Sequence, residues 1–159
     1  MASVFKDILE LTRDWRRMLQ QAQTDRNKKR GVRNVLLTET EFNTDLILEH
    51  YLGQGVAAEK IIEKLRMEHL GKALESGFDF SELKKGRISE RHCGDHPMLK
   101  KYIGYDAEAL MRKIYHHLGQ LKLLPELYDL KDEKKVNVRL RLENLGRRYL
   151  LLLRFLSDR

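Results

Sequence analysis

Apolar residues recur at alternating spacings of three and four residues near both ends of the 159-residue chain. This period places the apolar residues of each stretch on one face of an α-helix. The N-terminal set comprises Phe5, Ile8, Thr12, Trp15, Leu19 and Ala22. The C-terminal set comprises Val138, Leu142, Leu145, Tyr149, Leu152 and Leu156. We therefore expect helices over about residues 3–24 and 132–156, each with one face to bury.

The composition supports the same fold class. The chain is 42% apolar and 35% charged, with only 2 Pro and 10 Gly, which is too apolar for disorder and too poor in turn residues for an all-β fold. Its length suits one hydrophobic core. We expect a single all-α domain over residues 1–159, an antiparallel bundle of four to five helices in which the N- and C-terminal helices pack together.

Two further helices are expected before residue 77. The first ends at the glycine-containing turn 53–55 and begins either at a capping box of Thr38 and Glu41 or near residue 33. The second follows that turn as one helix and ends at Ser76, before a C-terminal glycine. The apolar face of this second helix comprises Ala58, Ile62, Leu65, His69 and Ala73.

The chain between residues 77 and 105 is expected to contain short helical pieces, with Phe78 and Phe80 on the core and a loop at 92–97. A longer helix then begins at the N-cap Asp106 and stops or kinks at Pro125. Its apolar face comprises Leu110, Ile114, Leu118 and Leu121.

The net charge of +7 favours an anionic partner, either nucleic acid or an acidic protein. The densest basic cluster comprises Arg26, Lys28, Lys29, Arg30 and Arg33. These residues could contact phosphates through salt-sensitive charge neutralisation, or they could form a solvated connection between helices. No aromatic residues are interleaved with them, so base stacking is not expected.

Cys93 is the only cysteine, which excludes an internal disulfide and fits a reducing compartment. The N-terminal stretch lacks the pattern of a secretory signal, and the most apolar run, 149–156, is too short to span a bilayer. We expect a soluble cytoplasmic protein without membrane contact. Leu150, Leu151 and Leu153 lie off the apolar seam and need cover from residues 77–105 or from a second chain, which would make a homodimer.

Several chemical sites can be weighed from residue types and spacing. Zinc takes ligands such as His92, Cys93, Asp95 and His96, but the spacing matches no familiar zinc motif and no second cysteine pair completes it. The chain also lacks a Glu-x-x-His pair and a phosphate-binding glycine loop. We therefore expect no metal and no cofactor.

The stretch from Arg112 to His117 reads RKIYHH, an arginine followed by a histidine after four intervening residues. In this pattern, in size and in helical class the chain resembles the HEPN family of helical bundles. That resemblance implies a metal-independent endoribonuclease of a defence or toxin–antitoxin system. Arg112 and His117 would then lie at a dimer interface and act on the RNA phosphate and its 2′-hydroxyl.

Helical geometry gives these residues different surroundings. At about 100° per residue, Arg112 and His117 lie about 140° apart, with His117 in the apolar arc and His116 on the wet face. His69 and His117 are therefore expected to be buried, hydrogen-bonded residues, or alternatively a pair that meets inside the bundle. The leading prediction is a non-enzymatic, basic interaction module, and the ribonuclease is the alternative.

Overall fold

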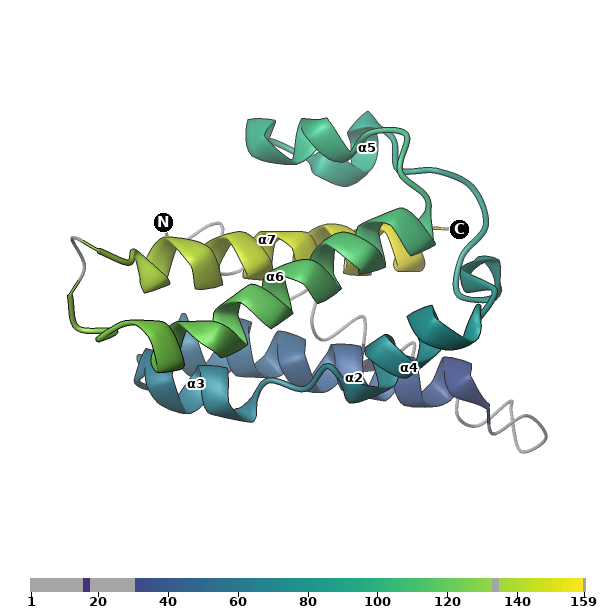
Figure 1. Ribbon diagram of the computed structural model, residues 1–159. Helices are drawn as coiled ribbons and strands as arrows, with labels where there is room; N and C mark the ends of the chain where they lie inside the picture. The colour runs from purple at the N-terminus through teal and green to yellow at the C-terminus, as the bar shows by residue number, and fades with distance from the viewer. Residues whose placement is uncertain (1–15, 18–30, 133–134, 159) are drawn as a thin grey trace.

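The computed structural model describes residues 16–17, 31–132 and 135–158, and in these ranges the chain is helical and contains no strand (Figure 1). The elements are α2 (Val32–Asp45), the π-helical η1 (Leu46–Tyr51), α3 (Ala58–Lys64), α4 (Glu68–Ser76), the 3₁₀ turn η2 (Phe80–Glu82), α5 (Glu90–Cys93), the 3₁₀ segment η3 (Pro97–Tyr102), α6 (Ala107–Leu127) and α7 (Val138–Ser157). The expected all-α class is confirmed.

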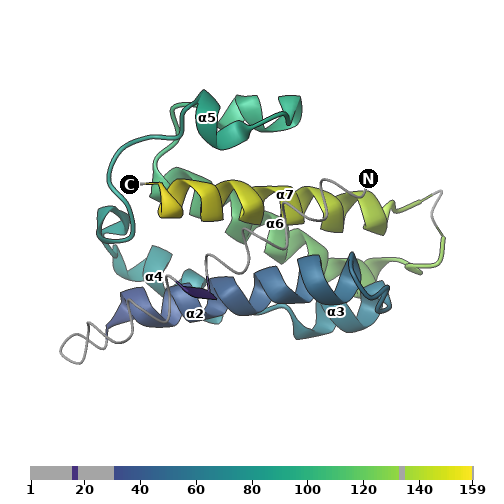
Figure 2. The same ribbon diagram turned by 180° about the vertical axis from the view of Figure 1, so that it is seen from behind.

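The helices form an antiparallel bundle in three tiers. Helices α6 and α7 form a hairpin at the centre, α2, α3 and α4 lie on one side of it, and α5 and η3 lie on the other (Figures 1 and 2). Helix α2 packs against the C-terminal helix α7.

The predicted helix 3–24 lies outside the described residues except for Arg16 and Arg17, which are helical. Arg16 forms ion pairs with Asp45 at 3.2 Å and with Glu49 at 3.0 Å.

The helix before the turn at 53–55 begins at Val32, as in the longer of the two alternatives. Thr38 is therefore not an N-cap but lies within the helix, where its Oγ1 donates to the carbonyl oxygen of Asn34 at 2.9 Å. The same helix continues as the π-helical segment η1 up to the turn, where Gly55 takes a left-handed φ of 69°.

The expectation of one helix between residues 58 and 76 was wrong, because the chain breaks at residues 65–67 into α3 and α4. Asn43 on α2 stabilises this break through its side-chain amide. Its Oδ1 accepts from the backbone N–H of Arg66 at 2.8 Å, and its Nδ2 donates to the Arg66 carbonyl at 2.5 Å. The Asn43 Nδ2 also donates to the buried hydroxyl of Tyr149 at 3.0 Å. One buried amide thus joins the break to α7.

A second side chain of α2 starts helix α4. The buried carboxylate of Glu39 accepts from the backbone N–H groups of His69 and Leu70, both at 2.9 Å. These are donors that a helix leaves unpaired at its N-terminus, where a negative charge is also favoured. Because α4 starts anew after the break, its buried face does not continue the face of α3, and His69 is exposed. The prediction that His69 is buried was therefore wrong.

The segment after α4 agrees with most expectations. Gly77 ends α4 with a left-handed φ of 71°, Phe80 is buried, and Phe78 is half-buried against the core. Short helical pieces follow, as predicted. The loop expected at 92–97 begins later, because His92 and Cys93 belong to α5 and are buried.

The two longest helices begin with side-chain caps. Asp106 Oδ1 accepts from the Ala109 N–H at 2.8 Å, which confirms the predicted N-cap of α6. Helix α6 continues through Pro125 to Leu127, two residues beyond the expected stop. Helix α7 begins at Val138 rather than near 132, and its predicted seam is buried up to Leu152.

Leu150, Leu151 and Leu153 are buried within the single chain. Elements α5 and η3 pack against α7, so residues 77–105 provide cover on that side of the helix. These leucines form no exposed apolar surface in this structure, and the homodimer through them stays a prediction.

Candidate functional site

Most of the predicted basic cluster lies outside the described residues, namely Arg26, Lys28, Lys29 and Arg30. Arg33 is described and lies in the first turn of α2. Its side chain is half-buried, and its Nε donates to the carbonyl oxygen of Glu82 at 2.9 Å. Arg33 therefore holds η2 against the start of α2.

Arg112 and His117 lie on different faces of α6, as helical geometry predicted. Arg112 is exposed and makes two hydrogen bonds to Glu108 Oε1, at 2.9 and 2.7 Å. It lines a hollow with Tyr115 and residues of α4. His117 lines a separate cleft and is half-buried at the rim of the bundle. The expected burial of His117 in the core was wrong, and no residue of α4, His69 included, lines its cleft.

The cleft at His117 lies between α6 and α7 and has a volume of about 170 Å³. It is lined by His117, Gln120 and Leu121 from α6, and by Arg141, Asn144 and Arg148 from α7. We name it the Arg148 cleft. None of the described residues that line it carries a carboxylate. Its polar surface is therefore cationic or neutral.

Arg148 is the most unusual residue of the cleft, because it is charged and only 7% exposed. Its Nε donates to the hydroxyl of Tyr102 at 2.6 Å, and its guanidinium lies 5.9 Å from the centre of that ring. Its Nη1 is buried and has no hydrogen-bond partner among the described residues. Buried charges are normally paired, since an unpaired one loses its hydration without compensation.

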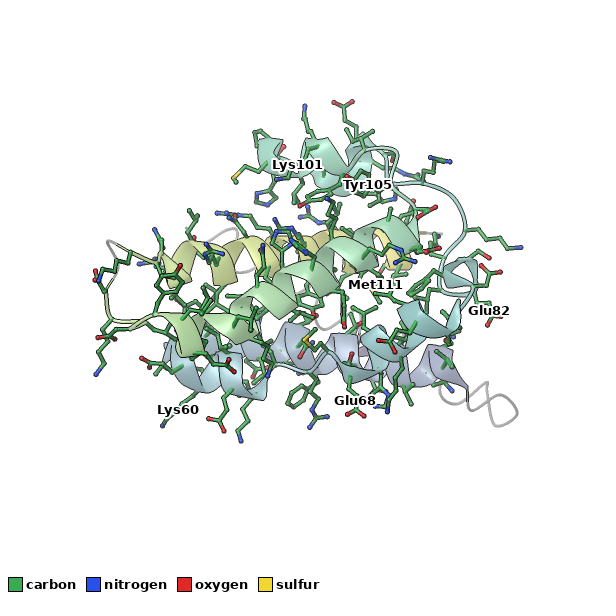
Figure 3. All side chains as sticks on the ribbon, in the orientation of Figure 1. Lys60, Glu68, Glu82, Lys101, Tyr105 and Met111 are labelled. Carbon is green, nitrogen blue, oxygen red and sulfur yellow. The ribbon has the colours of Figure 1, made fainter. Side chains whose placement is uncertain are left out.

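Element η3 adds to the positive charge. Lys101 is exposed beside Tyr102, with its Nζ 5.3 Å from the centre of that ring. Lys101 and Tyr105 belong to the segment that lies over α6 and α7 in Figure 3. Lys101 and Arg148 are close enough to act electrostatically on His117. Cations from two elements, η3 and α7, thus share one neighbourhood.

His117 is fixed in orientation by its own helix. Its Nδ1 donates to the carbonyl oxygen of Lys113 at 2.6 Å, so in the neutral ring the lone pair is on Nε2. Burial lowers the pKa of His117, the bond to Lys113 opposes that change, and Arg148, His116 and Lys101 lower the pKa further. The imidazole is therefore neutral near pH 7. The adjacent His116 is exposed, with its ring centre 5.7 Å away and nearly perpendicular.

The other polar groups of the cleft are available as donors. Asn144 Oδ1 accepts from Arg147 Nη1 at 2.8 Å, which leaves the Asn144 Nδ2 hydrogens free to donate. Arg141 is exposed and has no ion pair within the described ranges. An anion in the cleft would meet two guanidinium groups and an amide donor.

A second constellation joins Ser89, His92 and Asp158, and it resembles a catalytic triad only in residue types. The backbone N–H of Ser89 donates to His92 Nδ1 at 2.8 Å, and His92 Nε2 donates to Asp158 Oδ2 at 2.7 Å. The Nδ1 bond closes a capping box at the start of α5, and the Nε2 bond fastens the end of α7 to it. The imidazole is buried with both nitrogens occupied, so this arrangement is structural.

The residues that suggested a zinc ligand set do not converge. In the described part of the chain, no three His, Cys, Asp or Glu side chains are placed to hold a metal ion. Cys93 is buried, its Sγ lies 3.7 Å from the Ser89 carbonyl, and burial raises the pKa of the thiol. A thiol with a raised pKa is a poor nucleophile at neutral pH.

Arg141 and Arg148 were not assigned to a site from the sequence. Their spacing of seven residues was the available signal, because it puts both on the same helix face. The contribution of Tyr102 and Lys101 has no comparable signal, since η3 reaches α7 only through the tertiary fold.

Comparisons with protein-family models, with curated proteins and with solved structures each gave no match to this chain. Among the described helices, none combines the length and apolarity that a membrane span requires.

Proposed function

We propose that this chain is a non-enzymatic helical-bundle module of the cytoplasm that binds nucleic acid at the Arg148 cleft. The observation that carries the proposal is the buried guanidinium of Arg148, which has no carboxylate partner among the described residues. A phosphate group would supply the missing anion and hydrogen-bond acceptors.

The surrounding charges favour a polymer of phosphates over an isolated carboxylate. Arg141 and Lys101 are exposed on different elements beside the cleft, and the whole chain carries a net charge of +7. Successive phosphates of one strand can bind these separated cations at the same time. Each cation that binds a phosphate adds to the affinity through counterion release. An acidic protein is the competing partner.

Fluorescence anisotropy with labelled single-stranded RNA and DNA, measured over a series of salt concentrations, tests this proposal. Arg141→Ala is expected to weaken binding about five- to tenfold and to reduce the salt slope by about one. Arg139→Ala is the matched control, because Arg139 is exposed on the same helix but paired with Glu143 at 2.9 Å. The control is expected to bind nearly as the wild type does. Binding of polyglutamate but of neither nucleic acid would overturn the proposal in favour of an acidic protein partner.

The HEPN-like ribonuclease is a second candidate, favoured by one observation. The neutral Nε2 of His117 shares a cleft with two arginines, which are groups able to act on an RNA phosphate. Arg112 lies on another face of the same chain, so it could reach His117 only across a homodimer. Light scattering tests for that dimer.

Incubation of RNA with the protein in the presence of a metal chelator separates the two candidates. Asparagine at position 117 can retain a donor toward the Lys113 carbonyl while it removes Nε2. Cleavage by the wild type that is lost in His117→Asn and in Arg112→Ala would establish the ribonuclease. Binding without cleavage supports the non-enzymatic module.

A further inference from the structure

We infer that the Arg148 cleft recognises a phosphomonoester, the terminal phosphate of a nucleic acid strand, rather than an internal phosphodiester. This inference rests on the proposed function, because it specifies which phosphate of the bound strand enters the cleft.

The size of the cleft limits its occupant. Its volume of about 170 Å³ is below the roughly 300–1,000 Å³ that pockets for whole drug-sized ligands have. A single phosphate group with its ester oxygen suits such a space better than a whole nucleotide does. A terminal phosphate is attached to the strand on one side only. An internal phosphate is attached on both sides, so the small cleft would have to admit the strand on both sides of it.

The charge of the cleft favours a dianion. Arg148 is buried and Arg141 is exposed, and neither has an acidic partner within the described ranges. A phosphomonoester carries a charge of about −1.5 to −2 near pH 7 and offers three acceptor oxygens. A phosphodiester carries one charge and has only two free oxygens. The monoester can therefore balance both guanidinium groups and also accept from the Asn144 amide.

His117 adds a chemical distinction between the two kinds of phosphate. Its Nδ1 is engaged by the Lys113 carbonyl, so Nε2 is the ring nitrogen left for the cleft. A monoester has a titratable proton with a pKa near 6, and when this proton is shared between a phosphate oxygen and Nε2 the phosphate group carries a charge between about −1 and −2, which still exceeds the charge of a diester. A diester has no such proton, and a neutral imidazole would present a lone pair to its oxygens. Protonation of His117 to accommodate a diester is opposed by burial and by the nearby cations.

The experiment uses the full chain and oligonucleotides of one sequence that carry a 5′-phosphate, a 3′-phosphate or hydroxyl groups at both ends. At least one phosphorylated form is expected to bind about tenfold more tightly than the hydroxyl form. His117→Asn and Arg141→Ala are expected to remove this preference. Arg139→Ala changes an exposed arginine of α7 that is paired with Glu143 and does not line the cleft, so it is the control and should retain the preference.

The outcomes separate the two proposals. Equal binding of all three oligonucleotides would overturn the phosphomonoester inference and leave nucleic-acid binding intact. No binding of any oligonucleotide would overturn the proposed function. Competition by adenosine monophosphate or inorganic phosphate that matches the phosphorylated strand would keep the phosphomonoester and replace the strand with a small phosphorylated ligand. Circular dichroism of each variant confirms that loss of preference is not loss of fold.

Discussion

Most buried polar side chains among the described residues are paired, but two buried guanidinium nitrogens, Nη1 of Arg33 and Nη1 of Arg148, have no hydrogen-bond partner there. Glu39 caps α4, Asn43 joins the helix break to Tyr149, and His92 bonds on both sides of its ring. Arg148 is buried to a similar degree but has an unpartnered nitrogen and no carboxylate among the described residues. Arg148 is the more deeply buried of the two arginines, and since folded chains rarely leave buried charges uncompensated, a ligand is expected there.

The pKa of His117 is expected to lie below the ordinary value of 6.5, mainly because of burial, with Arg148 and Lys101 adding to the effect. NMR titration of the imidazole signals measures it. Lys101→Gln should raise this pKa, whereas Lys131→Gln, an exposed charge on the loop between α6 and α7, should not. A pKa at or above 6.5 in the wild type would contradict the assignment of a half-buried, cation-flanked ring.

The lowered pKa of His117 also has a consequence for stability. The unfolded chain takes up this proton at a higher pH than the folded chain does. The contribution of His117 to the free energy of unfolding is therefore full above pH 6.5 and is lost as pH falls from there to the folded-state pKa. His117→Asn should remove this part of the pH dependence.

At the level of helices, side chains of α2 determine how the following segment is divided. Asn43 pairs both backbone groups of Arg66, and the Arg66 guanidinium lies 3.7 Å from the centre of the Phe42 ring. Glu39 then caps the start of α4 by accepting from the backbone N–H of His69, three residues after Arg66. The break between α3 and α4 is thus maintained by contacts with α2 and not by a helix-breaking residue.

Asn43→Ala is expected to lower the free energy of unfolding by about 2–3 kcal/mol, because it leaves the Tyr149 hydroxyl buried and unpaired and frees both Arg66 backbone groups. Urea denaturation followed by circular dichroism measures the change. Thr38→Ala, on the exposed face of the same helix, should change stability by less than about 0.5 kcal/mol. Equal losses in the two variants would show that the amide does not maintain the break.

Across the whole molecule, Asp158 fastens the end of α7 to the tier that contains α5 and η3. It binds His92 at 2.7 Å and forms an ion pair with Arg91, while its backbone carbonyl accepts from Lys84. This tier holds Tyr102 against Arg148 and places the charge of Lys101 near His117. The contact of Tyr102 with Arg148 therefore depends on how α5 and η3 are held over the α6–α7 hairpin.

Asp158→Asn is expected to lower the melting temperature at neutral pH. The pKa of Asp158 is lowered by its hydrogen bond to His92, by the nearby charge of Arg91 and by further nearby cations. A carboxylate with a lowered pKa stabilises the fold above its unfolded value of 3.8, and this stabilisation is lost as pH falls through the folded-state pKa. The difference from the wild type should therefore shrink in acid.

Thermal melts at neutral and at strongly acidic pH measure this difference. Glu126→Gln is the control, because it also removes one carboxylate from an exposed residue with no ion pair in the described ranges. A variant at Asp158 that melts like the control at neutral pH would show that the contact does not hold the tier in place.

Periodicity and capping chemistry were enough to predict the helical class, the buried seam of α7, the cap at Asp106 and the glycine stop at Gly77. These features depend on interactions between residues a few positions apart in the sequence, so the sequence pattern is enough to predict them. The division of α3 from α4 could not be predicted, because Asn43 acts on a backbone 23 residues away. For the Arg148 cleft, the spacing of Arg141 and Arg148 could predict only that both arginines lie on one face of α7. The hydrogen bond from Arg148 to Tyr102, 46 residues away, could not be predicted, because it requires the packing of η3 on α7, which sequence spacing does not encode.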